Sequence, residues 1–135
     1  MGLFDVFKNN FRKKTTDVDF EKVKYTGKMQ LENNFDGSID SPTWQQVQLY
    51  INKIIQNNEE FITLTLSEAV YGVRYMQACS AKGEYSLQLG VETDAKTNLV
   101  ERVCDKKELV ERFAQFYEYG FVHDIDRFKP VSFFT

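Results

Sequence analysis

The sequence predicts one α+β domain, in which an antiparallel sheet of about four to six strands packs against two main amphipathic helices. Apolar residues alternate with period two at 61–66 and 85–92, as in strands with one buried face. They recur with helical spacing after residues 43 and 105. Short connections join the consecutive strands, and a parallel pair would need a long crossover. The 135 residues, 42% of them hydrophobic, suffice for a single domain with its own core.

Residues 1–19 are predicted to form a basic amphipathic arm ahead of a single domain at 20–135. Apolar residues recur there at helical spacing, at Leu3, Phe4, Phe7 and Phe11. Basic residues lie among and after them, at Lys8, Arg12, Lys13 and Lys14. A short N-terminal helix is therefore expected. Such a helix can lie on a membrane surface, but it is marginal alone in water, so the sequence favours an arm folded back on the domain.

Residues 20–31 alternate imperfectly, which indicates a strand or a loose hairpin before the turn-rich stretch 33–38. The clearest element follows: Ser41 is expected to cap a helix whose first position is Pro42. Its apolar stripe comprises Trp44, Val47, Ile51, Ile54 and Ile55.

Four strands are predicted between the helices, at 61–66, 73–79, 85–92 and 99–104. The inward side chains of the two most regular strands are Ile62, Leu64, Leu66, Tyr85, Leu87, Leu89 and Val91. Asp105 and Glu108 have the spacing of a capping box at the start of the second main helix, and Gly120 suits its left-handed end. The aromatic tail from residue 121 is expected to pack back on the domain.

Charge is distributed unevenly along the chain. Residues 1–28 hold seven Lys and Arg against four Asp and Glu, and residues 29–135 hold ten against sixteen. The acidic body lacks the basic stripe with which proteins neutralise phosphates, so a nucleic-acid partner is disfavoured. A basic protein partner suits it better.

The small number of cysteines and the lack of a recognisable targeting signal indicate a cytoplasmic protein. The chain has two cysteines, Cys79 and Cys104, and a secreted disulfide scaffold of this size would carry more. Both are therefore expected to be reduced thiols on strands. No apolar run approaches the roughly 18 residues that span a membrane, and the N-terminus lacks the long apolar stretch of a signal peptide.

No recognisable catalytic constellation is present in the sequence. His123-Asp124 is the one place where the histidine meets a carboxylate, and no nucleophile motif accompanies it. The seven glycines are scattered and form no phosphate-binding loop. With one histidine and two cysteines, a structural zinc site would need carboxylate ligands. The sequence thus predicts a protein without catalytic activity, and no cofactor or metal ligand is assigned.

The candidate binding residues are polar and aromatic side chains at outward positions of neighbouring strands. Tyrosine is enriched at binding hot spots, so two tyrosines are included as anchors. The predicted residues are Tyr71, Arg74, Tyr75, Gln77, Gln88, Glu92 and Glu101. The alternative is a plain solvated face, because one side of an antiparallel sheet can meet water.

The order of motifs over 44–119 resembles small cytosolic immunity proteins of bacterial polymorphic-toxin and contact-dependent inhibition systems. A helix opening on Ser41-Pro42-Thr43-Trp44 precedes the strand 61–66, then Tyr75-Met76-Gln77-Ala78, the strand 85–92 and a helix that ends at Phe113–Gly120. The resemblance implies a protein that binds and occludes a toxin domain without chemistry of its own. Acidic inhibitors commonly meet basic toxins through complementary charge.

Two other functions stay open at this point. A small-ligand-binding module or an enzyme could use a pocket between sheet and helices, with His123, Asp124 or Cys79. A peripheral membrane protein could be held by residues 3–14, although a short basic helix gives little affinity alone. The sequence identifies neither the partner nor the oligomeric state.

Overall fold

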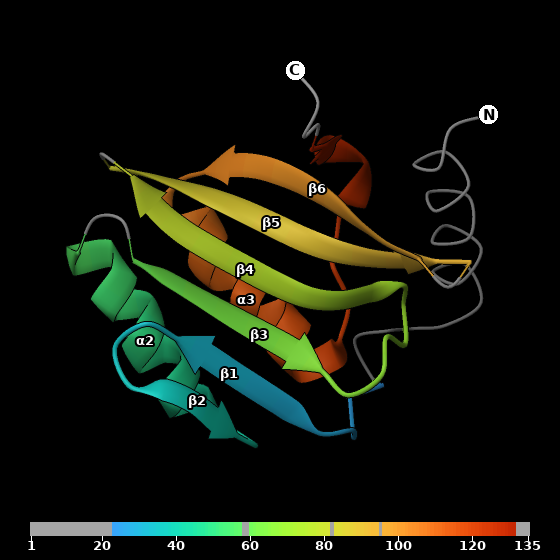
Figure 1. Cartoon of the computed structure of the whole chain (residues 1–135), viewed down its shortest axis with the longest axis horizontal. Coiled ribbons are helices and arrows are strands. Elements are labelled where there is room, and N and C mark those ends of the chain that lie inside the picture. Colours follow the sequence, from blue (N-terminus) through green and yellow to red (C-terminus); the bar gives the residue numbers. More distant parts are fainter. Residues whose placement is uncertain (1–22, 58–59, 82, 95, 132–135) are drawn as a thin grey trace.

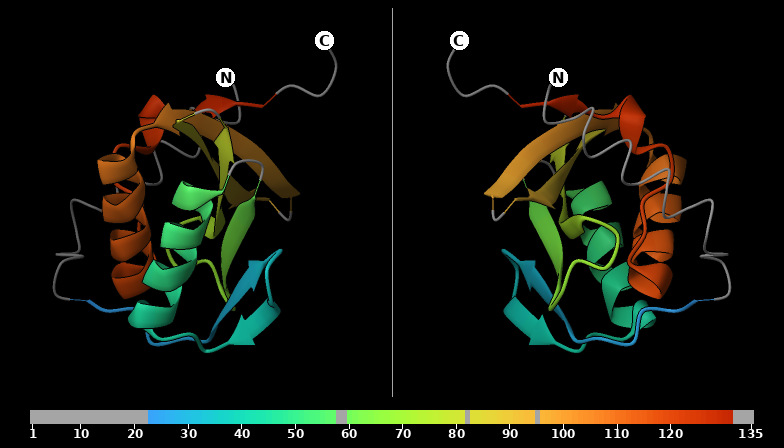
Figure 2. Two further views of the ribbon diagram at one scale, coloured as in Figure 1. Left: turned by 90° about the vertical axis from the view of Figure 1, so that its left-hand side faces the viewer. Right: turned by 90° about the vertical axis from the view of Figure 1, so that its right-hand side faces the viewer.

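The computed structural model describes residues 23–57, 60–81, 83–94 and 96–131, which form two layers (Figure 1). A seven-stranded antiparallel sheet makes one layer, and the helices α2 (Trp44–Gln56) and α3 (Lys106–Tyr119) make the other. Both helices cover the same face of the sheet (Figure 2). The predicted α+β class, with an antiparallel sheet and two main helices, is confirmed. Neither described helix has the length and apolar content needed to cross a membrane.

The strand order is β2-β1-β3-β4-β5-β6-β7, and every neighbouring pair is antiparallel. Helix α2 connects β2 to β3, and β3 to β6 follow as a meander. Helix α3 and the 3-10 helix η2 (Ile125–Arg127) separate β6 from β7. The strands are β1 (Met29–Asn33), β2 (Gly37–Asp40), β3 (Phe61–Leu66), β4 (Val73–Ala81), β5 (Glu84–Thr93), β6 (Lys96–Cys104) and β7 (Lys129–Pro130).

The sheet has more strands than the four to six expected, because the two edge strands, β2 and β7, show no alternation of apolar and polar residues. Strand β2 has one aliphatic residue, Ile39, among its four. Strand β7 has two residues, and Pro130 is one of them. A proline is tolerated at a sheet edge, where its missing N–H breaks no inner ladder. The predicted N-terminal helix and the boundary at residue 19 lie outside the described residues.

Helix α2 begins later than the sequence indicated. The N-cap is Thr43, whose Oγ1 accepts a hydrogen bond from the Gln46 N–H at 3.1 Å, while Gln46 Oε1 accepts one from the Thr43 N–H at 2.9 Å. Ser41 has a left-handed φ of 51°, whereas an N-cap residue is extended. The assignment of Ser41 as the cap and Pro42 as the first helical residue was therefore wrong, because a complete capping box forms two residues further on.

Both predicted ends of α3 are confirmed. Asp105 Oδ1 accepts a hydrogen bond from the Glu108 N–H at 2.8 Å. Gly120 has a φ of 68° and donates its N–H to the Phe116 carbonyl at 2.8 Å. The carboxylate of Glu108 does not complete the expected capping box, because it binds Arg102 and Arg112 instead.

The core fills the space between the sheet and the two helices. Every inward side chain predicted for β3 and β5 is buried. The helices contribute Val47, Tyr50, Ile51, Ile54, Leu109, Phe113 and Phe116. The described part of the tail packs back as expected, with Phe121, Val122, Ile125 and Phe128 buried.

Candidate functional site

The sheet face turned away from α2 and α3, here called the open face, is the candidate functional surface (Figure 2). Strand register arranges its side chains in rows that run across the sheet. A polar row lies in the middle and comprises Glu32, Thr63, Gln77, Gln88, Glu101 and Lys129.

Hydrogen bonds connect the middle of the polar row. The Thr63 hydroxyl donates to Gln77 Oε1 at 3.0 Å, and Gln77 Nε2 donates to Gln88 Oε1 at 3.5 Å. Gln88 Nε2 then donates to Glu101 Oε2 at 3.4 Å. Each amide both accepts and donates along the row, so each side chain restricts the orientation of the next. The Thr63–Gln77 bond has an ordinary length, whereas the two contacts made by the amide Nε2 groups are long and therefore weak.

An apolar row lies beside the polar row. It contains Phe61, Cys79, Ser86 and Val103, which are neighbours on β3 to β6. Phe61 is 36% exposed and Val103 is 59% exposed, although both lie within regular strands. The sequence analysis did not include Phe61 and Val103 among the binding candidates. An apolar residue at an outward strand position is the signal that could have identified them.

A third row contains Thr65, Tyr75, Gly90 and Leu99. The Tyr75 ring lies across Gly90 on the next strand, where an added Cβ atom would overlap the ring carbons. Glycine at position 90 therefore lets the aromatic ring lie flat on the sheet.

An ion pair borders this row at an irregularity in β4, where the register shifts between Val73 and Tyr75. Arg74 Nε donates to the Leu66 carbonyl at 2.5 Å, and its Nη1 lies 3.4 Å from Glu92 Oε1. Both side chains are more than a third exposed, so the pair contributes little to stability. The open face as a whole carries charges of both signs.

The structure brings together six of the seven predicted binding residues, at Arg74, Tyr75, Gln77, Gln88, Glu92 and Glu101. Tyr71 does not join them. It is 8% exposed and packs edge-on against Phe121, with ring centroids 5.3 Å apart. Its assignment as an exposed aromatic anchor was wrong, because it lies in the connection before β4, where strand periodicity no longer indicates direction.

A cluster of charges on the helix side links β6, α3 and the following segment. Glu108 accepts hydrogen bonds from Arg102 Nε at 2.6 Å and from Arg112 Nε at 2.8 Å. These guanidinium groups lower the pKa of Glu108 to about 2, against the opposing effect of burial. Arg112 also donates to the His123 carbonyl at 2.6 Å, and its guanidinium lies 5.0 Å from the centre of the Phe128 ring.

His123 lies beside this cluster with its side chain largely in solvent. Its Nε2 is 3.3 Å from Asp124 Oδ1, and its side chain is 65% exposed. A pocket of about 410 Å³ adjoins it, and the described residues that line the pocket include four carboxylates but no Ser, Thr or Cys. Cys79 is on the opposite face of the sheet. Across the described ranges, no group of three or more His, Cys, Asp and Glu side chains could hold a metal ion.

A second pocket, of about 610 Å³, opens where the segment before β1 passes the ends of the two helices. Its walls include Met29, Trp44 and Tyr117. The two rings are 5.7 Å apart between centroids, and the Tyr117 hydroxyl donates to the Pro42 carbonyl at 2.8 Å. Three segments far apart in the sequence form this aromatic pocket, so no local signal could have revealed it.

The chain matches no family model, no curated protein and no solved structure.

Proposed function

We propose that the chain is a non-catalytic binding protein that occludes a partner protein with its open face, in the manner of an immunity protein that blocks a toxin domain. The observation that carries this proposal is the asymmetry of the sheet. The two described helices cover one face of the sheet, and its other face presents exposed Phe61 and Val103 and half-buried Tyr75 around the polar row.

The composition of the open face suits a protein partner. Interfaces combine aromatic and aliphatic anchors with polar groups that fix the register, and the open face offers both. The hydrogen bond between Thr63 and Gln77, and the longer contacts from Gln77 to Gln88 and Glu101, restrict these side chains in part, which reduces the entropy lost on binding. Such a surface can block a partner by contact alone.

Charge favours a basic partner in the cytoplasm. Residues 29–135 carry ten basic and sixteen acidic residues, so the body attracts a basic domain and speeds the encounter. Since the open face itself carries both signs, the specificity of the proposed complex rests on the rows of side chains more than on net charge.

Co-expression with the protein encoded by the adjacent gene tests the proposal. The unmodified chain should restore growth when that protein is toxic, and Gln88→Arg should weaken the complex about tenfold or more, because it places a cation within the contact area. Gln48→Arg, on the exposed side of α2, is the matched control and should bind normally.

Two results would contradict the proposal. One is a stable complex whose affinity responds to Gln48→Arg but not to Gln88→Arg, since the partner would then occupy the helix side. The other is turnover of a substrate by the purified chain that is lost when His123 or Asp124 is replaced, which would favour an enzyme.

A further inference from the structure

The aromatic pocket combines aromatic rings with a carboxylate. Trp44 and Tyr117 both line it, with ring centroids 5.7 Å apart and ring planes inclined at 47°. Tyr25 and Met29 line it as well, and Glu118 contributes a carboxylate whose side chain is 45% exposed. The faces of aromatic rings carry partial negative charge, so the rings and the carboxylate attract the same kind of ligand, a cation.

The backbone of α3 adds to this attraction. The pocket lies beside the C-terminal half of the helix, where Ala114, Tyr117 and Glu118 line it. The dipole of a helix is negative at this end, and the last turn of α3 contains no basic residue. The electrostatics of the pocket therefore favour a positively charged ligand over a neutral or an anionic one.

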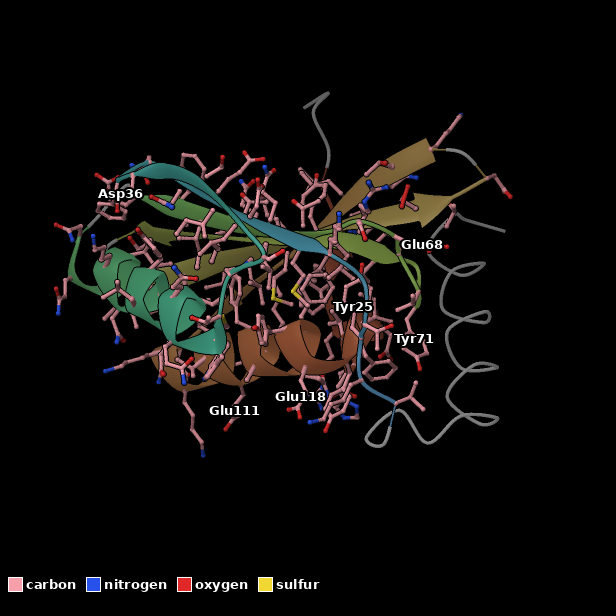
Figure 3. The ribbon with its side chains drawn as sticks, turned by 90° about the horizontal axis from the view of Figure 1, so that it is seen from below. Tyr25, Asp36, Glu68, Tyr71, Glu111 and Glu118 are labelled. Carbon is pink, nitrogen blue, oxygen red and sulfur yellow. The ribbon has the colours of Figure 1, made fainter. Side chains whose placement is uncertain are left out.

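Lys24 shows that an amine can approach the carboxylate at the rim of the pocket. Its Nζ lies 3.5 Å from Glu118 Oε1, and its side chain is 70% exposed. The next residue, Tyr25, donates its N–H to the Glu118 carbonyl at 2.8 Å, so the segment before β1 runs beside α3 (Figure 3). Because so exposed an ion pair contributes little to stability, a ligand cation can displace Lys24 at little cost.

We propose that the aromatic pocket binds a small alkylammonium compound, in which apolar methyl groups surround the positive charge. The ammonium group contacts the rings of Trp44 and Tyr117 and faces the Glu118 carboxylate. The pocket volume of about 610 Å³ is in the range of small-molecule sites and leaves room for the remainder of the ligand. The pocket shares no lining residue with the rows of the open face, so this inference goes beyond the proposed function and can fail or hold without it.

The two tyrosine rings are held in place by their hydroxyl groups. The Tyr117 hydroxyl donates to the Pro42 carbonyl at 2.8 Å, and the Tyr25 hydroxyl lies 2.9 Å from Ser67 Oγ. Rings that are fixed before binding lose little conformational freedom when a ligand arrives, so little of the affinity is spent on ordering them.

Titration with choline tests the proposal against a ligand of the same shape without the charge. The control ligand is its carbon isostere, in which a tert-butyl group replaces the trimethylammonium group. Choline should change the emission of Trp44, the only tryptophan of the chain, in a saturable way at constant ionic strength, and calorimetry should give the same Kd. The isostere should bind at least about fivefold more weakly. Equal binding of the two compounds, or no saturation by about 20 mM choline, would overturn the proposal.

The two members of the rim ion pair should affect choline binding in opposite directions. Glu118→Gln should weaken it about fivefold because the carboxylate is lost, and Lys24→Gln should strengthen it about twofold because a competing ammonium group is removed. Glu111→Gln, at another exposed position of α3, is the matched control and should leave the Kd unchanged. Circular dichroism confirms that each variant is folded. Choline binding that Glu118→Gln leaves unchanged would contradict the proposed site.

A short peptide that contains trimethyllysine distinguishes the source of the alkylammonium group. The peptide presents the same charged group on a protein chain. Affinity equal to or below that of choline supports a free small compound as the ligand. Affinity at least about tenfold higher would overturn that assignment in favour of a modified protein segment.

Discussion

Glu108 binds two guanidinium groups and thereby connects three parts of the chain. Arg102 reaches it from β6 and Arg112 from its own helix, while Arg112 continues to the carbonyl of His123. The sequence predicted Glu108 as a capping residue from its spacing to Asp105. That role was partly wrong, because two cations that lie close only in the folded chain compete for its carboxylate.

Replacing Glu108 should destabilise the fold in a pH-dependent way. The folded pKa of about 2 lies below the ordinary value of 4.5, so this stabilisation is fully present above pH 4.5 and is lost as pH falls through about 2. At pH 7, Glu108→Gln should lower the free energy of unfolding by about 2–3 kcal/mol. Urea denaturation of both proteins at pH 7 and pH 3 measures the difference.

At pH 3 the difference between the two proteins should be less than half its value at pH 7. Glu111→Gln, at an exposed position of the same helix, is the control and should change stability by less than about 0.5 kcal/mol. A Glu108→Gln effect of equal size at both pH values would show that its charge is not what stabilises the native state.

The two thiols should differ sharply in reactivity. Burial, followed by the charge of Glu108, raises the pKa of Cys104 to about 11. At pH 8 only about one in a thousand such thiols is ionised, and the thiolate is the reactive form. Cys79 is partly exposed on the open face. Alkylation of the folded protein should therefore stop at one group, on Cys79, and reach two after denaturation; mass spectrometry that finds Cys104 modified first would contradict this.

At the scale of elements, the sequence predicted those helices and strands that have a regular pattern or a single capping signal. It did not predict which of two nearby residues caps a helix. The bounds of β3 and the ends of α3 agree with the sequence because period-two alternation and the Asp105 and Gly120 signals are unambiguous. The start of α2 was misplaced because two capping candidates, Ser41 and Thr43, are adjacent to Pro42. Only the reciprocal bond with Gln46 distinguishes them. The edge strands β2 and β7 form through pairing with longer neighbours, which no pattern of their own encodes.

The capping of α2 gives a direct comparison between the two candidates. Thr43→Ala should lower the free energy of unfolding by about 1 kcal/mol, because the Gln46 N–H loses its acceptor. Ser41→Ala should have a smaller effect, since Ser41 does not cap the helix. Thermal denaturation of both variants measures this, and an equal or larger loss for Ser41→Ala would contradict the assignment of the cap.

At the scale of the whole molecule, the main feature is a sheet covered on one face. Period-two alternation explains why Tyr75, Gln77, Gln88, Glu92 and Glu101 share one face of the sheet, whereas Arg74 joins them at the register shift between Val73 and Tyr75. Alternation does not apply to Tyr71, which precedes β4 and is buried, and Phe61 and Val103 were not considered as binding candidates although both are exposed. The aromatic pocket was beyond prediction, since Met29, Trp44 and Tyr117 meet only after the layers pack.

The most direct test of the open face as the binding surface is the alkylation rate of Cys79 with and without the bound partner. Cys79 lies in the apolar row between Phe61 and Ser86, inside the proposed contact area. Saturating the chain with the partner protein should slow its alkylation by about tenfold or more, as expected for a thiol that exchanges solvent for an interface. Formation of a stable complex in which Cys79 reacts as fast as in the free protein would contradict the account.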